Sequence, residues 1–209
     1  MNQNQIKWLA TILMVVDHIG VLTESEPMRI IGRLSFPLFA WVFTQNWQLP
    51  GEKKKLINRL LLFGVISQIP YILLFNNLQL NIMFSFAAAA TTFSCIRKFN
   101  RKIAILGIGL ASSQILGISY GWYAVACPLM MISLKGKGDR LWWFGWSITN
   151  IIYAISSNSL IQLFEIFAPI ILAYNNPDKN QKPTAIEKKI FYYFYPVHLA
   201  ALAALQTII

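Results

Sequence analysis

The chain has 209 residues, of which 56% are hydrophobic and 12% are charged, and its formal net charge is +10 at pH 7. This apolar fraction exceeds what the core of one soluble domain requires, so the composition excludes an ordinary soluble enzyme and predicts an integral membrane protein. The 18 basic residues are spread along the chain in short groups and do not form one face. We therefore do not expect nucleic acid as a partner.

Apolar segments predict about nine membrane-spanning helices, with eight or ten possible because several segments are short. In chain order the predicted spans are 6–22, 29–48, 56–75, 81–96, 103–119, 121–134, 141–157, 159–174 and 188–208. We expect the first to be a retained span, because Asp17 and His18 interrupt its apolar run and no small-residue cleavage site follows. The predicted fold class is all-α: a polytopic integral membrane helix bundle that forms a single domain over residues 1–209.

Basic loops alternate with uncharged loops between these spans. Lysine and arginine gather at 53–59, 97–102, 135–140 and 179–189, whereas the loops near 76–80, 120 and 158 carry no charge. Cytoplasmic loops of membrane proteins are enriched in lysine and arginine. The pattern therefore predicts that the basic loops and the amino terminus are cytoplasmic and that the carboxyl terminus is outside.

Ionisable residues interrupt the first two spans. Asp17 and His18 are adjacent in the first, and Arg29 and Arg33 share a face of the second because they lie four residues apart. At a rise of about 1.5 Å per residue, His18 lies roughly 16 Å beyond Lys7, just past the membrane midplane. Charged side chains are costly at this depth when they face lipid, so they indicate a polar pocket that opens to the outer face. Other polar residues expected in the same layer are Ser67, Gln68, Asn81, Asn150, Glu165 and His198.

A structural interpretation of this layer stays open. Asp17 could pair with Arg29 or Arg33 and lock two helices together. Gln68 and Asn150 could likewise form hydrogen bonds between helices, with no role in chemistry.

The neighbours Asp17 and His18 are expected to differ in role. Adjacent residues on a helix point about 100° apart, so Asp17 is not expected to orient His18 as in a catalytic triad. We expect Asp17 to contact another helix and His18 to carry the function. His198, two residues after a proline, is a second histidine candidate.

Six segments together resemble a known family. They read DHIG at 17–20, RIIGRLSFPLFA at 29–40, SQIPY at 67–71, NIMFS at 81–85, YGWY at 120–123 and FYPVHL at 194–199. In combination they resemble the TraX family of bacterial membrane proteins, which is named for the acetylation of conjugative pilin and is similar to the wider transmembrane acyltransferases. Many of those enzymes have an arginine eleven residues before the first-span histidine. Lys7 holds that position here, which keeps the charge but loses the two-pronged guanidinium.

The resemblance implies a multi-pass acetyltransferase of the bacterial cytoplasmic membrane. It would transfer an acetyl group from cytosolic acetyl-CoA to an amine or hydroxyl of a protein or glycan acceptor, which is the pilin amino terminus in the name-giving case. His18 is the expected general base, with a covalent acyl-histidine as the alternative. Asp17 would align Arg29 or Arg33, which would stabilise the oxyanion or hold the acceptor. The residues expected to bind acceptor or donor are Lys7, Ser35, Gln68, Asn81, Tyr120, Trp122 and His198, and no metal is expected.

Two other functions fit the same residues. A transporter or lipid flippase also needs a polar site in the middle of the membrane, although no duplicated half is visible in the sequence. A noncatalytic assembly protein would use Asp17 and Arg29 only to pair helices. The residues do not identify the acceptor, because a protein amino terminus, a glycan hydroxyl and a lipid headgroup are all compatible with them.

Overall fold

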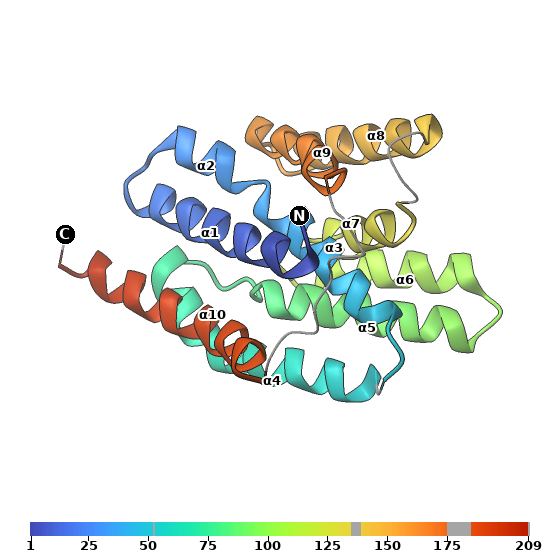
Figure 1. Ribbon diagram of the computed structural model, residues 1–209, viewed down its shortest axis with the longest axis horizontal. Helices are drawn as coiled ribbons and strands as arrows, with labels where there is room; N and C mark the ends of the chain where they lie inside the picture. Colours follow the sequence, from blue (N-terminus) through green and yellow to red (C-terminus); the bar gives the residue numbers. More distant parts are fainter. Residues whose placement is uncertain (52, 135–138, 175–184, 209) are drawn as a thin grey trace. The chain divides into compact units, whose positions relative to one another are not determined.

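Figure 1 shows the computed structural model, which describes residues 1–51, 53–134, 139–174 and 185–208, with the side chains of 185–191 left out. Within these residues the chain is helical apart from its loops and one isolated parallel bridge between Leu80 and Ile118. The all-α fold class is therefore confirmed for the described part of the chain. The predicted topology also depends on several basic side chains that lie outside the described residues: Lys135, Lys137, Lys179, Lys182, Lys188 and Lys189.

The chain forms two compact units that alternate along the sequence. Unit 1 contains Met1–Thr44 and Met130–Ala185, and unit 2 contains Gln45–Leu129 and Ile186–Ile209. The single domain expected over residues 1–209 stays a prediction.

Unit 1 holds the predicted residues Asp17, His18, Arg29 and Arg33. Its elements are α1 (Gln3–Leu22), α2 (Glu26–Gly32), the start of α3 (Ser35–Gln48), the end of α7 (Tyr123–Ile132), α8 (Arg140–Ser156), the 3-10 helix η1 (Leu160–Phe167) and α9 (Ala168–Leu172). Helices α1 and α2 lie side by side and run in opposite directions (Figure 1). Helix α2 also packs against η1, which in turn packs against α8. This packing brings α2 between the helix that carries Asp17 and the segment that carries Glu165.

Unit 2 contains three consecutive helices packed as neighbours. They are α4 (Lys53–Phe75), α5 (Ile82–Lys98) and α6 (Lys102–Ile115), with α5 in contact with both of the others. The end of α3, most of α7 and most of α10 (Ala185–Gln206) complete the unit. The loops before α5 and after α6 are joined at the bridge, where the Leu80 N–H donates to the Gly117 carbonyl at 2.9 Å and the Ser119 N–H donates to the Leu80 carbonyl at 2.7 Å.

The prediction of one continuous helix over 29–48 was wrong. Helix α2 ends at Gly32 and α3 begins at Ser35. Pro37 explains the interruption, because proline has no N–H to donate to the carbonyl four residues earlier and its ring clashes with that carbonyl, which here belongs to Arg33. The Leu34 N–H instead donates to the Ile31 carbonyl at 3.3 Å, which closes a tighter turn.

The prediction of a single helical span over 159–174 was also wrong. The segment begins as the 3-10 helix η1 and continues as the five-residue helix α9. Pro169 in the first turn of α9 cannot donate to the Glu165 carbonyl, which disfavours an uninterrupted α-helix through these positions. The Ala168 N–H donates to that carbonyl in its place.

Two of the described helices, α1 and α4, are long and apolar enough to cross a membrane. Helices α6 and α7 and the η1–α9 segment are apolar but shorter. The predicted spans 103–119 and 121–134 correspond to helices of only 14 and 10 residues. A bundle of about nine spans therefore stays a prediction.

Candidate active site

Helix α1 positions Asp17 and His18. It begins after Asn2, whose side chain accepts from the Gln5 N–H at 2.8 Å while the Gln5 side chain accepts from the Asn2 N–H at 2.8 Å. This reciprocal capping box satisfies two backbone donors at the start of the helix. Asp17 is buried, with 8% of its surface exposed, whereas the next residue, His18, is half-buried.

The Asp17 carboxylate is held between two arginines from the next segment of the chain. One terminal nitrogen of the Arg33 guanidinium donates to both Oδ1 and Oδ2 of Asp17. Nε of Arg29 lies 3.5 Å from Oδ1. The expectation that Asp17 contacts another helix is thereby confirmed, because its partners lie on α2 and at the α2–α3 junction. The ion pairs by themselves do not distinguish a structural lock between helices from a role in chemistry.

The two arginines differ in exposure. The Arg33 side chain is 7% exposed, and its Nε also donates to the Arg29 carbonyl at 3.3 Å. The Arg29 side chain is 30% exposed. Arg33 is therefore the residue that fixes Asp17 in place, and Arg29 is the more accessible of the two to a ligand.

Gly32 allows the close contact between α1 and α2. A Cβ atom at this position would lie 2.3 Å from Cβ and 2.6 Å from Cα of Asp17. Because Cα belongs to the backbone, the clash cannot be relieved by rotating a side chain. A glycine is thus required where the Arg33 segment passes Asp17.

Replacing Gly32 is therefore expected to separate the two helices. Gly32→Ala should lower the free energy of unfolding by about 1–3 kcal/mol through overpacking. Gly107→Ala is the matched control, because a Cβ at Gly107 of α6 would meet nothing within 4 Å. Alanine favours helix over glycine by about 1 kcal/mol, so the control should be neutral or stabilising. Thermal unfolding of the purified variants measures both effects, and an unchanged midpoint for Gly32→Ala would contradict the close contact.

Two predicted binding residues in unit 1 make backbone contacts. The Ser35 hydroxyl donates to the Ala10 carbonyl at 2.9 Å and so ties the start of α3 to α1. The Lys7 carbonyl accepts from the Thr11 hydroxyl at 2.9 Å. The Ser35 hydroxyl thus joins α3 to α1 about two helical turns before Asp17.

The remaining predicted binding residues belong to unit 2. The Asn81 side chain donates to Oε1 of Gln68 at 2.8 Å and to the Gly64 carbonyl at 2.7 Å, which joins the start of α5 to α4. This contact confirms the role of Gln68 in hydrogen bonding between helices. Nδ1 of His198 lies 2.9 Å from the Phe194 carbonyl on its own helix, and the His198 ring stacks on the Phe194 ring.

The YGWY segment forms a turn in unit 2. Tyr120 and Gly121 have φ angles of +68° and +53°, and the Trp122 ring meets the Tyr123 ring edge to face. The left-handed conformation at Tyr120 is uncommon for a residue with a side chain. The convergence of these unit 2 residues with His18 stays a prediction.

Two polar residues of unit 1 that the sequence places in the polar layer, but not among the site residues, are buried. Glu165 on η1 is fully buried, and η1 packs against α2, the helix that carries Arg29. Asn150 of α8 is also fully buried, and its Nδ2 donates to the Trp146 carbonyl at 2.8 Å. In the sequence, Glu165 is the only acidic residue of the apolar segment 159–174. An acidic residue within such a segment indicates function when it is deeply buried.

The described residues contain no group of three or more histidine, cysteine, aspartate or glutamate side chains that could hold a metal ion. Unit 1 also holds a half-buried imidazole, His18, next in sequence to the carboxylate that the two guanidinium groups contact. These are groups that can accept a proton and stabilise a developing negative charge.

The described residues form an all-helical fold with two apolar helices of membrane-crossing length and a buried carboxylate held by arginines. The sequence profile described as TraX protein matches residues 2–206, and the chain belongs to this family.

Individual relatives resemble the chain over different lengths. Protein TraX of Escherichia coli is 37% identical over 141 residues, which make up 65% of this chain and 57% of the relative. An uncharacterized protein of Rickettsia prowazekii (strain Madrid E) is 40% identical over 86 residues, 40% of this chain and 33% of the relative. The match thus spans about half or less of these two relatives.

A third relative is similar over nearly its full length. The probable fimbrial assembly protein FimC, serogroup H1, of Dichelobacter nodosus is 25% identical over 236 aligned positions, 96% of this chain and 93% of the relative. No solved structure matches the chain.

Proposed function

We propose that the chain is a multi-pass acetyltransferase of the bacterial cytoplasmic membrane, which transfers an acetyl group from cytosolic acetyl-CoA to an acceptor reached from the outer face. The observation that carries this proposal is the buried Asp17–Arg33 pair with Arg29 beside it and His18 next in sequence. Such a cluster in an apolar helix is costly and indicates function. Membership of the TraX family supports the same reaction, because the family is named for pilin acetylation.

In the proposed reaction, the acceptor nitrogen or oxygen forms a bond to the thioester carbonyl carbon, and His18 accepts the proton that the acceptor loses. The carbonyl oxygen becomes negatively charged in the tetrahedral intermediate, and the Arg29 guanidinium stabilises it. The carbon–sulfur bond then breaks and the CoA thiolate leaves, taking a proton from protonated His18 or from water. Arg29 is assigned this role because its side chain is more exposed than that of Arg33.

Asp17 and Arg33 act as positioning residues in this scheme. Their ion pair fixes the α2–α3 junction against α1, so the distance between Arg29 and His18 is set by a rigid contact. Preorganised charge of this kind lowers the barrier because little reorganisation is needed as the oxyanion forms.

The acceptor proposed first is the amino terminus of a pilus or fimbrial subunit. The relatives named TraX and fimbrial assembly protein support a partner of this class. The orientation proposed from the basic loops, with a cytoplasmic amino terminus, places the donor on one side of the membrane and this acceptor on the other.

The test is transfer of label from acetyl-CoA. Membranes that contain the protein are incubated with acetyl-CoA labelled in the acetyl group, and membranes from cells that lack the gene are the control. We expect thiol release above the control and one labelled acceptor that mass spectrometry identifies. The membranes come from the natural host, so that the acceptor is present. Thiol release no faster than in the control would reject acetyl transfer and leave a transporter or a noncatalytic assembly protein as the alternatives.

A further inference from the structure

Gly20 of α1 lies against the first turn of α2. A Cβ atom at this glycine would lie 2.8 Å from Cβ of Met28, 3.1 Å from the backbone nitrogen of Arg29 and 3.2 Å from the Ser25 carbonyl oxygen. None of these three atoms is the far end of a flexible side chain. A larger residue at position 20 therefore fits only if the start of α2 moves away from α1.

Hydrogen bonds also connect Gly20 to Arg29. The Gly20 carbonyl accepts from the Ser25 N–H at 3.0 Å, and the Ser25 carbonyl accepts from the Arg29 N–H at 3.1 Å. Ser25 is the N-cap residue of α2, so the first of these bonds ties the beginning of that helix to α1. The backbone of Arg29 is thus placed relative to α1 both by this pair of bonds and by the close contact at the glycine.

The α1–α2 interface has one glycine on each helix. Gly32 of α2 lies against Asp17, and Gly20 of α1 lies against Arg29. Because Gly20 comes three residues after Asp17, the two share a face of α1. Arg29 therefore has its backbone against Gly20, while its Nε lies 3.5 Å from Oδ1 of Asp17, about one helical turn earlier on α1. The place of this guanidinium beside Asp17 depends on how closely α2 approaches Gly20.

We propose that Gly20 is a positioning residue, which holds Arg29 where its guanidinium can stabilise the oxyanion of acetyl transfer. This inference rests on the proposed function, and it assigns no chemistry to Gly20 itself. The two glycines then differ in role. Gly32 allows the backbone to pass Asp17 next to Arg33, the residue that fixes the carboxylate, whereas Gly20 sets the place of the arginine that acts on the substrate.

Gly20→Ala is expected to lower kcat for acetyl transfer by about tenfold or more. Moving Cβ of Met28 from 2.8 Å to 3.4 Å, where ordinary contact begins, shifts the start of α2 by about 0.6 Å, and a misplacement of about 1 Å can cost 10²-fold in rate. KM should change by less than about twofold, because the oxyanion exists only beyond the bound state. Rates are measured with labelled acetyl-CoA at equal amounts of folded protein.

Combination with Arg29→Ala tests whether Gly20 acts through this arginine. Arg29→Ala alone should lower kcat by about 10²- to 10³-fold, as for loss of an oxyanion donor. In a chain that already carries Arg29→Ala, the change Gly20→Ala should lower kcat by less than about twofold further, because the group that it displaces is absent. If Gly20 only supports the fold, the two losses should multiply, and that result would overturn the inference.

Met28→Gly removes the atom that lies nearest to a Cβ at position 20. The double variant Gly20→Ala/Met28→Gly should therefore have a kcat about threefold or more above that of Gly20→Ala, and an unfolding midpoint higher than the two single losses predict. Without this recovery, the contact between Gly20 and the start of α2 would not be the cause of the loss. The inference would also be overturned if Met28→Gly folds and the double variant does not.

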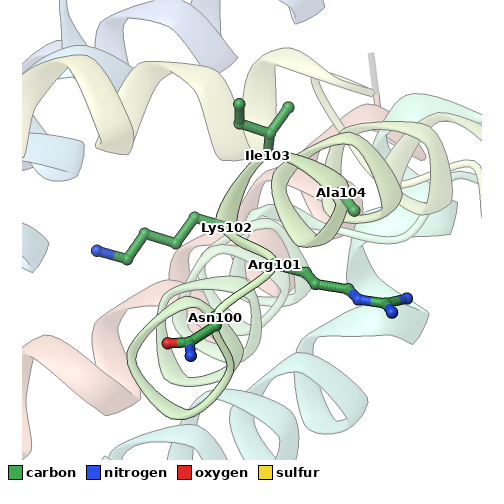
Figure 2. A pocket seen from close by; sticks show the side chains of 5 residues that line it. All are labelled: Asn100, Arg101, Lys102, Ile103 and Ala104. Carbon is green, nitrogen blue, oxygen red and sulfur yellow. The ribbon is translucent and has the colours of Figure 1, made fainter.

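Gly107→Ala and Ala104→Gly on α6 are the matched control pair, since they make the same exchange of glycine and alanine at exposed positions. A Cβ at Gly107 would meet nothing within 4 Å. Figure 2 shows Ala104 beside an open hollow of the surface, which residues 100–104 line. Their effects on the unfolding midpoint should add, with kcat within about twofold of the parent value. Recovery as large as in the first pair would indicate helix propensity alone and contradict the inference.

If Gly20→Ala does not fold, Gly20→Ala/Met28→Gly takes its place, because the 3.1 Å approach to the Arg29 nitrogen remains. Its kcat should be about threefold or more below that of Met28→Gly, and this difference should disappear in chains that carry Arg29→Ala. Equal values would overturn the inference. Absence of acetyl transfer in the parent protein rejects the proposed reaction, whereas an active parent with an unchanged kcat in Gly20→Ala rejects only the role of Gly20.

Discussion

His18→Ala is expected to lower the rate of acetyl transfer by about 10²- to 10⁴-fold, the range typical for loss of a general base. His18 is half-buried on α1, next to the residue that the arginines hold, so it is the titratable side chain nearest in sequence to the charged cluster. Rates are measured with labelled acetyl-CoA at equal amounts of folded protein. Added imidazole should restore part of the lost rate, because it can accept the proton that His18 would take.

His198→Ala is the matched control for this prediction. His198 is the other histidine of the chain, and its Nδ1 contacts the Phe194 carbonyl on its own helix. We expect it to lower the rate by less than about tenfold, well below the effect expected of a general base. A folded His18→Ala variant with the parent rate would reject the role of His18. An effect of His198→Ala as large as that of His18→Ala would require both histidines in the mechanism.

The largest expected loss of stability comes from Asp17→Ala. Arg33, whose side chain is 7% exposed, would then be left as a buried charge without its carboxylate partner. Removing one partner of a buried ion pair typically costs about 3–5 kcal/mol, and Arg33→Ala should cost a similar amount. Arg29→Ala should cost about 1 kcal/mol or less, since its side chain is 30% exposed and water screens its charge.

Unfolding midpoints of the three single variants and of the double variant Asp17→Ala/Arg33→Ala measure these contributions. The double variant should be more stable than the sum of the two single losses predicts, because the residues interact directly. Equal losses for Arg29→Ala and Arg33→Ala would contradict the assignment of Arg33 as the structural partner. Arg29→Ala should affect acetyl transfer more than stability, because Arg29 is proposed to stabilise the oxyanion.

A variant with the two charges exchanged distinguishes the catalytic hypothesis from the assembly hypothesis. In the swapped variant Asp17→Arg/Arg33→Asp the pair is kept but its direction is reversed. If pairing of helices is the whole function, a well-folded swapped variant should support pilus or fimbrial assembly as the parent protein does. If the proposed chemistry is correct, the swapped variant should fold and be inactive, because the charge beside Arg29 and His18 has changed sign.

Local sequence predicted two of the long helices closely. The expected segments 56–75 and 141–157 correspond to α4 and α8 within a few residues. The expected segments 29–48 and 159–174 did not form single helices, because Pro37 and Pro169 prevent an α-helical hydrogen bond at those points. The presence of a proline does not by itself predict such an interruption, because Pro70 lies inside α4 and Pro196 lies inside α10.

The sequence by itself determined that Asp17, His18 and the two arginines are candidates for function. Burying an ionisable group in an apolar segment costs free energy however the helices pack. Only the tertiary structure decided that Arg33 holds Asp17, that Arg29 stays more exposed, that Gly32 lies against Asp17 and that Glu165 is fully buried. The periodicity of a helix follows from neighbouring residues, whereas the choice between two arginines one turn apart depends on how closely two helices approach. That distance is set by the packing of α1 against α2, which no pattern within either segment contains.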